Sequence, residues 1–468
     1  MLRPNGKTIG SKKRNLWPRA VYTSIGPNAL RCRRRDGQIT TNPLKITLLT
    51  YGSRGDVQPF VALALGLQKA GHTVRLVAPH RFSDFAAQHG IPFVSLAGDP
   101  EKMSAFLNNS GRNIFSMVKA MADYVFSIAS PVARTAFAAC ADADLIVHSF
   151  LFTVGGHSLA RKMGIPDVSV QTFPIFAPTH AFPMVALPDV AAGGLSYFTH
   201  WLAIQIFWRV GNMGFRQLRA AEPDLSDLKL LWPFDSSRPI RTPLLFAYSP
   251  TVLPQPDDWT APHIHITGYY FLEALETYRP SQELVDFLTA GEAPVCVTFG
   301  SMVNRKSERI EAIVRAALAQ TRQRGIILTG WGGRKPAEHA KDLFYLDSAP
   351  HDWLFPRCKS VIHHGGAGTT AAGLRAGIPN IVIPHGIDQP FWGKCVAAIG
   401  AGPAPIDLRK LSVESLTAAF TKANGAACRV RAQETGRLIR AEDGVGRAVR
   451  LIEQHAANMA SPKSTECP

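Results

Sequence analysis

The sequence predicts an α/β protein built from two doubly wound domains, each with a parallel sheet covered by helices. Two series of short apolar runs alternate with longer helical stretches, the first from about residue 45 and the second from about residue 293. A proline-rich stretch at 254–280 separates them. Alternating strands and helices form parallel sheets through right-handed crossovers, and such sheets bind ligands at the carboxyl ends of their strands. The sequence therefore predicts two Rossmann-like domains that face a ligand cleft.

The composition is typical of a globular protein and does not indicate a nucleic-acid partner. Of the 468 residues, 46% are hydrophobic and 18% are charged, which allows a large core. The net charge of +16 is concentrated at one end: residues 1–44 contain ten Lys or Arg and one acid, whereas the other 424 contain 41 basic and 34 acidic residues. Residues 1–44 are therefore interpreted as a basic, disordered tail, with a membrane-surface anchor and a targeting segment as alternatives.

Neither the cysteines nor the hydropathy pattern indicates a secreted or membrane-spanning protein. The seven cysteines are scattered and form no CxxC pair, which argues against a disulfide framework or a metal site. No uninterrupted run of 18 apolar residues occurs, and the nearest approach, at 195–210, is interpreted as an amphipathic or buried helix. We therefore expect a cytoplasmic protein whose contact with membranes, if any, is peripheral.

The first series predicts a domain at 45–253, followed by an interdomain connector at 254–290. Helices are predicted at 59–70, where Gly71 ends the pattern, and at 112–140. Strands are predicted at 46–52, 73–79, 93–96, 144–149, 166–172 and 244–249. The section between the last two strands is less regular and rich in aromatic residues.

The second series predicts a domain at 291–440. A helix is predicted at 307–324, and strands are predicted at 293–301, 325–330, 343–348, 360–366 and 379–386. The last segment, 441–457, predicts a helix with no strand after it, which is free to pack back onto the first domain.

The most informative segment, HHGGAGTT, runs from His363 to Thr370 at the end of a predicted strand. A helix is predicted to begin at Thr369 or Thr370. Glycines permit a tight turn and a close approach of ligand to backbone, and a helix N-terminus attracts a diphosphate. The alternative is a glycine-rich turn without a ligand. Neither the P-loop pattern nor the dinucleotide fingerprint is present.

In this motif and four others the chain resembles the family 1 glycosyltransferases of the GT-B fold, which use nucleotide sugars. It is most similar to their branch of sterol 3-beta-glucosyltransferases and bacterial antibiotic glycosyltransferases. The resemblance covers about residues 45 to 450, in the family's order and spacing. It is carried by GSRGDVQPF (52–60), FGSM (299–302), APHDWLF (349–355), HHGGAGTTAAGLRAGIP (363–379) and GIDQPFWG (386–393).

The resemblance implies that the second domain binds the nucleotide-sugar donor. The implied contacts are Ser301, His364, Gly366, Ala367, Gly368, Thr369 and Thr370 for the diphosphate, Ala349, Pro350 and His351 for the base, and Asp388 and Gln389 for the sugar. Plant members stack a Trp on uracil at the position that aligns with Ser348. Trp353 is either a substitute for that ring or a core residue.

The resemblance also implies that Asp56 is the catalytic base that takes the proton of the acceptor hydroxyl. A free Asp is a weak base, and desolvation would raise its pKa. The alternative is that Asp56 only caps a helix. The implied reaction is a direct displacement with inversion that converts an α-linked donor into a β-glycoside. No metal is expected, because the helix dipole and His364 would stabilise the leaving diphosphate and no DxD carboxylate pair lies near the HHGGAGTT motif. No cofactor is expected either, because the UDP-sugar is a co-substrate.

The acceptor is expected to bind the aromatic section of the first domain, around Phe173, Phe176 and Trp201, although these residues could equally be core. A flat apolar acceptor would suit such a pocket. We therefore predict transfer of a hexose, glucose from UDP-glucose, to a hydroxyl of a lipophilic acceptor such as a sterol. The alternatives are a polyketide, glycopeptide or glycolipid acceptor with a TDP- or UDP-sugar donor, and a nucleotide-sugar epimerase, which is a different class of enzyme.

Overall fold

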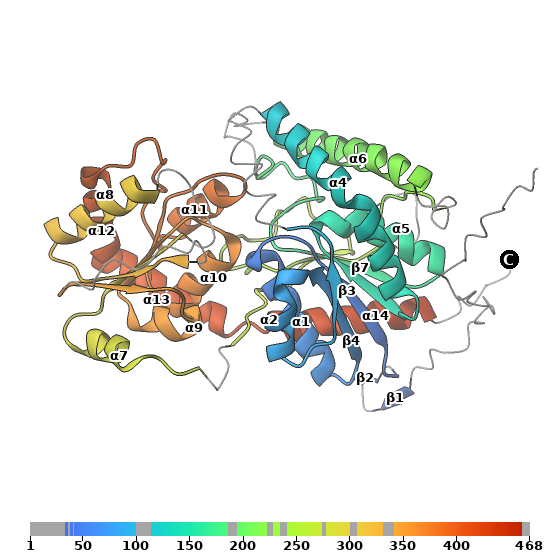
Figure 1. The fold of residues 1–468 in the computed structure, drawn as a ribbon, viewed down its shortest axis with the longest axis horizontal. Helices are drawn as coiled ribbons and strands as arrows, with labels where there is room; N and C mark the ends of the chain where they lie inside the picture. Colours follow the sequence, from blue (N-terminus) through green and yellow to red (C-terminus); the bar gives the residue numbers. More distant parts are fainter. Residues whose placement is uncertain are drawn as a thin grey trace, which may run out of the picture.

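The computed structural model shows two α/β domains side by side (Figure 1). It describes residues 33–35, 38–40, 42–99, 114–185, 194–221, 228–234, 241–273, 278–299, 307–330 and 341–460. Most of the tail expected at 1–44 lies outside these residues. The described part of the tail includes an antiparallel pair, β1 (Arg33–Arg35) with β2 (Gln38–Thr40).

The first domain contains a seven-stranded sheet in which every pair of neighbours is parallel. The order is β5-β4-β3-β6-β7-β8-β9, so the chain starts in the interior of the sheet, winds to one edge and then returns to build the other side. The topological switch lies between β3 and β6. The strands are β3 (Lys45–Leu49), β4 (Thr73–Pro79), β5 (Phe93–Leu96), β6 (Leu145–His148), β7 (Asp167–Gln171), β8 (Leu244–Phe246) and β9 (Ile264–Ile266).

Strand β9 lies within 254–290, the range that the sequence analysis assigned to the connector. It pairs in parallel with β8, and Ile266 is buried in a cluster that also contains Phe246 and Trp259. The sheet of the first domain therefore extends to Ile266. A three-residue strand is too short to show the period-two alternation by which strands are recognised in a sequence.

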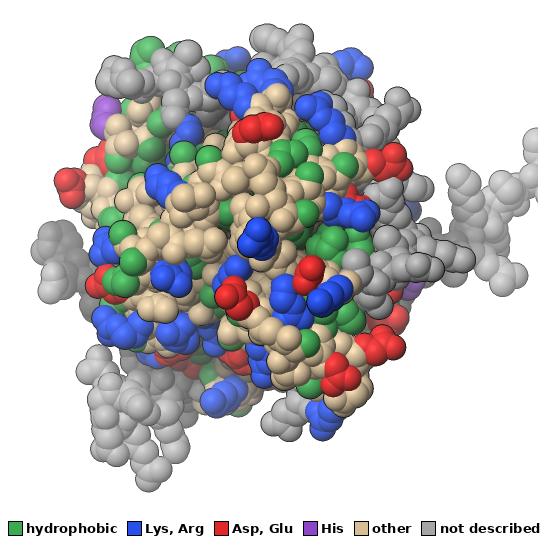
Figure 2. Space-filling model, turned by 90° about the vertical axis from the view of Figure 1, so that its left-hand side faces the viewer, with side chains coloured by type: hydrophobic (Ala, Val, Ile, Leu, Met, Phe, Trp, Pro, Cys, Tyr) green, Lys and Arg blue, Asp and Glu red, His purple; other side chains and the backbone are tan. Residues whose placement is uncertain are grey.

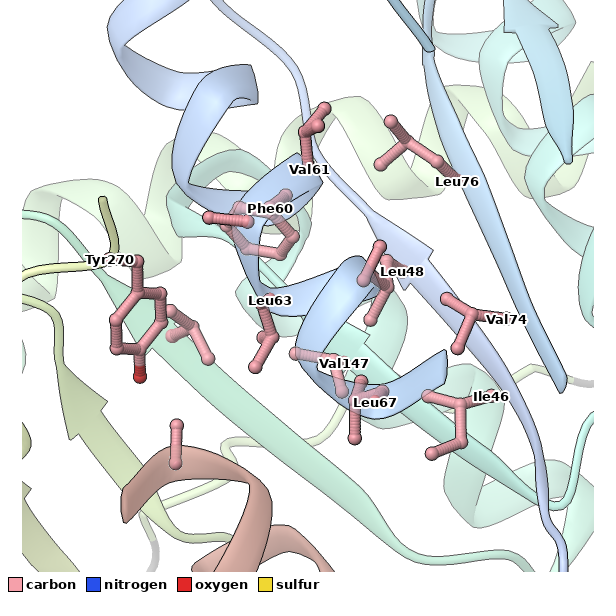
Figure 3. Packing of buried hydrophobic residues seen from close by; sticks show 14 of the residues in the cluster. Ile46, Leu48, Phe60, Val61, Leu63, Leu67, Val74, Leu76, Val147 and Tyr270 are labelled. Atoms are coloured by element: carbon pink, nitrogen blue, oxygen red, sulfur yellow. The ribbon is translucent and has the colours of Figure 1, made fainter. Parts of the chain in front are cut away.

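Helix α1 (Arg54–Lys69) begins five residues before its predicted start. Ser53 is its N-cap and forms a capping box with Asp56, which fixes the first turn ahead of Pro59. The apolar face of α1 covers the sheet. Figure 3 shows its side chains against those of β3, β4 and β6, in a core that includes Ile46, Leu48, Phe60, Val61, Leu63, Leu67, Val74, Leu76, Val147 and Tyr270.

The remaining helices of the first domain include the two long ones, α4 (Ile114–Cys140) and α6 (Ser196–Ala221), which contact each other and lie together at the outer edge of the domain (Figure 1). Helix α6 continues eleven residues beyond the predicted 195–210. In the described parts of the chain, no helix is long and apolar enough to cross a membrane. The shorter helices are η1 (His80–Phe82), α2 (Ser83–Gln88), η2 (Phe150–Phe152) and α5 (Thr153–Met163).

The second domain contains a five-stranded parallel sheet of order β12-β11-β10-β13-β14, with its switch between β10 and β13. The strands are β10 (Val295–Thr298), β11 (Gly325–Leu328), β12 (Leu343–Leu346), β13 (Ser360–His363) and β14 (Asn380–Val382). The helices are α7 (Gln282–Thr289), α8 (Ser307–Gln320), α9 (His351–Leu354), η5 (Phe355–Arg357), α10 (Ala367–Ala376), α11 (Gln389–Ala398), α12 (Val413–Asn424) and α13 (Ala426–Arg440).

The last helix, α14 (Gly444–Ala460), leaves the second domain and lies along the first, beside α1 (Figure 1). Gly66 of α1 lies directly against Val445, and the absence of a side chain there permits the close approach. Ile452 is fully buried in the core of the first domain. Just before the helix, Glu442 accepts hydrogen bonds from the hydroxyls of Ser249 (2.5 Å) and Thr251 (3.1 Å) of the first domain.

We predict that Ile452→Ala destabilises the protein by about 2–5 kcal/mol, because it leaves a cavity between α14 and the first-domain sheet. The matched control is Val430→Ala on α13, where the side chain is 59% exposed and the expected change is within about 0.5 kcal/mol. Urea unfolding followed by fluorescence measures both. Equal stability of the two variants would show that α14 does not belong to that core.

Candidate active site

The carboxyl ends of the two sheets face each other. Asp56 follows β3 and His364 follows β13, and each of these strands borders the switch point of its sheet. Helix α1, which carries Asp56, contacts α10, which follows His364. After burial, the charge of Asp56 is a further cause that raises the pKa of Asp388, and the charge of Arg54 is a further cause that lowers the pKa of His351. The two predicted loops thus lie together, at the position where doubly wound sheets bind ligands.

The turn after β13 is braced by His363, a residue to which the sequence analysis gave no role. Its Nδ1 accepts a hydrogen bond from the N–H of Gly365 (3.0 Å), so its Nε2 carries the proton and donates to Oδ1 of Asn380 (2.9 Å). The ring is fully buried, and burial is the main cause that lowers its pKa to about 4. Gly365 has φ +92°, where a side chain would be strained. A neutral, fixed imidazole therefore sets the shape of the turn.

Helix α10 begins at Ala367, two residues before the predicted start, with Gly366 as its N-cap. Its first N–H groups, those of Ala367, Gly368 and Thr369, have no acceptor within the helix. Above Gly368 the space is open, because a side-chain carbon there would meet nothing within 4 Å. The earlier start turns three residues of the predicted diphosphate site into the first helical turn, which is the arrangement that binds an anion best.

Two polar side chains at this helix start lack partners among the described residues. The buried Oγ1 of Thr370 and the buried Nδ1 of His364 form no hydrogen bond. The His364 ring folds over Gly366, where a side chain would collide with its Nε2. Burial, together with the neighbouring His363 and His385, lowers the pKa of His364 to about 3, so the ring is neutral. Thr370 and His364 therefore each offer a polar atom at the start of α10 that no described residue uses.

The predicted base-binding residues form the entry to α9. The carbonyl of Pro350 accepts hydrogen bonds from Trp353 and Leu354, so it is not available to a ligand. Ala349 precedes it and is partly buried against the cluster that contains Leu354 and Phe355. His351 stacks on Phe355 at 4.4 Å between ring centroids. Burial is the main cause that lowers its pKa to about 4.

Trp353 is partly buried and packs against a core cluster of the second domain. Its ring lies 5.5 Å from that of Tyr278, edge to face, and the guanidinium of Arg357 lies 4.2 Å above it. These contacts hold the indole between the Arg357 side chain of η5 and the segment before α7. They favour the core alternative over a substitute for the uracil-stacking ring.

Asp388 and Gln389 begin α11 after a loop in which Ile387 has φ +55°. Oε1 of Gln389 accepts hydrogen bonds from the N–H groups of His385 (2.7 Å) and Gly386 (3.3 Å), which secures the loop. Oδ2 of Asp388 accepts one from the indole N–H of Trp392 (3.0 Å), one turn further on. The Asp388 side chain forms no helix cap.

Asp56 caps helix α1, which is the role that the sequence analysis gave as the alternative to catalysis. Its Oδ2 accepts hydrogen bonds from the N–H (2.7 Å) and the hydroxyl (3.0 Å) of Ser53. Gly52, with φ +147°, leaves room for the carboxylate, since a side chain there would overlap it. No described residue bonds to Oδ1, so capping leaves one oxygen for another partner. The capping bonds hold that oxygen in a fixed direction.

Burial raises the pKa of both carboxyls. The pKa of Asp388 is raised to about 6, by burial first and then by the charge of Asp56. Burial also raises the pKa of Asp56, against the lowering effect of the two bonds from Ser53. Two part-buried carboxylates that repel each other are typical of a functional site and of little use to stability.

The structure brings two of the three predicted acceptor residues together. Phe173 and Phe176 both pack on Phe150, with centroids 5.6 and 5.7 Å away. Trp201 lies apart from them on the outer side of α6, where it is 46% exposed and stacks on Phe198. The spacing of aromatic residues alone could not distinguish the inner face of α6 from its outer face.

Ser301 lies outside the described residues. An open surface depression of about 490 Å³ is lined by residues from Gln255 to His265, and none of the predicted site residues lines it. We therefore give it no part in the reaction. Among the described residues, no group of three or more His, Cys, Asp or Glu side chains could hold a metal ion.

Sequence reasoning missed the residues that hold the site in place, namely His363, Asn380 and Trp392. Trp392 is fully buried, and its ring packs edge to face on Tyr248 of the first domain at 5.6 Å. One signal was available: Trp392 follows Asp388 by four residues, which places both on one helix face. The hydrogen bond between His363 and Asn380 joins two strands that are separate in the chain, so no local sequence pattern indicates it.

Known proteins resemble the chain in sequence and in fold. The Glycosyltransferase family 28 N-terminal domain matches residues 46–180, and the Erythromycin biosynthesis protein CIII-like C-terminal domain matches residues 340–439. Two sterol 3-beta-glucosyltransferases of Arabidopsis thaliana are 36% and 33% identical over 88% of the chain, which spans 66% and 68% of their lengths. The crystal structure of the kitacinnamycin glycosyltransferase, 19% identical, superposes with a TM-score of 0.65 over 88% of this chain and 99% of that one. The predicted GT-B fold is confirmed.

The facing of the two loops predicts how Asp388 titrates. Asp56→Asn should lower the Asp388 pKa below about 6, because it removes a neighbouring negative charge. Trp392→Phe should raise the Asp388 pKa further, because it removes a hydrogen bond to the charged form. Carbon-13 NMR of labelled aspartate carboxyls measures both shifts, with the exposed Asp342→Asn as control. An Asp388 titration that ignores Asp56→Asn would contradict the facing arrangement.

Proposed function

The chain belongs to the sterol 3-beta-glucosyltransferase family, and we propose that it transfers glucose from UDP-glucose to a hydroxyl of a sterol. The observation that carries this proposal is the approach of Asp56 to Asp388 beside the start of α10. A base, a sugar-binding carboxylate and an anion site then surround one point. The chain spans about two thirds of the length of its plant relatives, so their activity supports the proposal for this chain without deciding it.

On the donor side, the first turn of α10 would hold the diphosphate. The free N–H groups of Ala367, Gly368 and Thr369 and the positive end of the helix stabilise the charge that develops as the diphosphate leaves. The Thr370 hydroxyl and the neutral His364 ring add donors. Asp388 and Gln389 would bind the sugar hydroxyls, since carboxylate and amide groups accept and donate hydrogen bonds.

On the acceptor side, Asp56 would accept the proton of the attacking hydroxyl. The acceptor oxygen then forms a bond to the anomeric carbon as the bond from that carbon to the diphosphate oxygen breaks. The attack comes from the face opposite the leaving group, so the α-linked donor gives a β-glycoside. UDP leaves with the bonding electrons, and the proton passes from Asp56 to solvent afterwards.

The acceptor itself would contact the aromatic cluster around Phe173 and Phe176, which follows β7 at the same edge of the sheet as Asp56. Phe182 of this section reaches the second domain, where its ring lies 5.3 Å from that of Phe391. Apolar rings next to a single base suit a lipophilic alcohol.

We predict that Asp56→Asn lowers kcat by about 10²–10⁴, the usual contribution of a general base, and leaves UDP affinity nearly unchanged. Steady-state kinetics and calorimetry with UDP measure the two effects. Retention of full activity would exclude Asp56 as the base.

The pH profile supplies a matched control. Activity requires ionised Asp56, so it falls as the pH falls through the raised pKa of that carboxyl. Ser53→Ala removes a hydrogen bond that lowers the Asp56 pKa, so the acid limb should move to higher pH while the plateau is kept. If Asp56 only capped α1, Ser53→Ala would change the stability of the protein but would not shift the acid limb of the pH profile.

We also predict that His364→Ala and Thr370→Val each weaken UDP binding by roughly 10-fold to 100-fold, the value of one hydrogen bond to a charged group. The control is His80→Ala, at an exposed position of the first domain. Calorimetry measures the affinities. Transfer should also persist in EDTA, because α10 supplies the positive field. If both variants bound UDP as tightly as the unaltered chain, the diphosphate would not bind at this turn.

A further inference from the structure

Most of the large hydrophobic side chains that the described chain exposes lie on or just before one helix, α6. Seven of the ten exposed ones are there. Isolated exposed hydrophobic residues need no explanation, but a cluster on one element indicates an interaction surface. The seven are Leu195 (58% exposed), Tyr197 (44%), Phe198 (51%), Trp201 (46%), Leu202 (39%), Ile206 (41%) and Met213 (59%).

The spacing of these residues forms a stripe along the outer side of α6. Phe198, Leu202 and Ile206 follow at intervals of four and therefore stack on one helix face. The same face continues with two exposed arginines, Arg209 and Arg216. The sequence of α6 contains no Asp or Glu. The outer face is thus aromatic and aliphatic toward its N-terminus and basic toward its C-terminus.

The opposite face of α6 is already occupied by the domain. The Nε2–H of His200 donates to the carbonyl of Phe182 (3.0 Å), and the ring of Phe207 packs 5.0 Å from that of Phe150. The exposed stripe is therefore not a core face turned outward. The helix is apolar on both sides in its first half, and Phe198, Leu202 and Ile206 on its outer side are exposed.

We propose that the outer face of α6 docks on an anionic lipid surface. Aromatic and aliphatic side chains beside arginines, on a helix that does not span, are what a helix lying in the membrane interface presents. The arginines complement the negative charge of the headgroups, and the rings enter the boundary with the acyl chains.

This inference rests on the proposed function, which needs an acceptor that resides in lipid. Phe207 links α6 to the proposed acceptor site, because it contacts both Phe150 and Phe176 in the aromatic cluster assigned to the acceptor. Docking through α6 would bring that cluster to the bilayer surface. An acceptor could then enter without crossing water.

The rest of the described surface offers no equal candidate. Val430 and Leu438 of α13 are exposed singly, among arginines of the same helix. On the outer end of the second domain, Figure 2 shows hydrophobic side chains scattered among charged ones. A second copy of the chain fits α6 less well, because its own α6 contributes no acid to neutralise the arginines.

The test uses the full-length chain and the double variant Leu202→Glu/Ile206→Glu, with Val430→Glu/Leu438→Glu as the matched control. Flotation with vesicles of phosphatidylcholine and phosphatidylserine measures partitioning without donor or acceptor. We expect the α6 variant to partition at least about tenfold less than the unaltered chain, and the control to partition equally. The basic N-terminal segment is present in all three and contributes equally.

Transfer to a detergent-solubilised acceptor should remain unchanged in the α6 variant, whereas transfer to a vesicle-embedded acceptor should fall. Two results would overturn the proposal: equal partitioning of the α6 variant and the control, or a dimer in the absence of lipid that only the α6 variant dissociates. Because flotation needs no catalysis, failure of the proposed function would show separately, as absence of transfer to the soluble acceptor.

Discussion

Three helices, α1, α10 and α11, begin at the gap between the two sheets, and their N-termini direct partial positive charge toward it. Asp56 lies in the first turn of α1, and Asp388 precedes the first turn of α11. The start of α10 is left with unused N–H groups. Parallel strands force this arrangement, because each strand delivers its following helix with the N-terminus at the carboxyl edge. Asp56, Asp388 and the proposed diphosphate site lie together because the helices that carry them all begin at this edge of the sheets.

The positive field in the site comes from backbone and not from histidine. Burial lowers the pKa of His351, His363, His364 and His385 to about 4 or below, so all four rings are neutral near pH 7. A neutral ring can donate one hydrogen bond and accept another, and His363 uses both. Helix ends do not titrate, so the anion site keeps its strength over the range in which Asp388 changes charge.

The order of elements, both parallel sheets and the glycine-rich helix start could be predicted, because each rests on local periodicity or on a motif. Helix boundaries were less predictable: α1 begins at Arg54 because Ser53 and Asp56 cap each other, and the proline at 59 suggested a later start. Contacts between distant segments, such as His363 with Asn380 and Trp392 with Tyr248, leave no pattern in the sequence. The division of α6 into a packed face and an exposed face required the fold.

The return of α14 to the first domain has a consequence for biosynthesis. The second domain is continuous along the chain, whereas the core of the first domain includes Val449, Ile452 and Ala456. The first domain is synthesised first, but during translation it lacks helix α14, which completes its core. We expect the first domain to complete its core only after α14 has left the ribosome, when the second domain has already been synthesised.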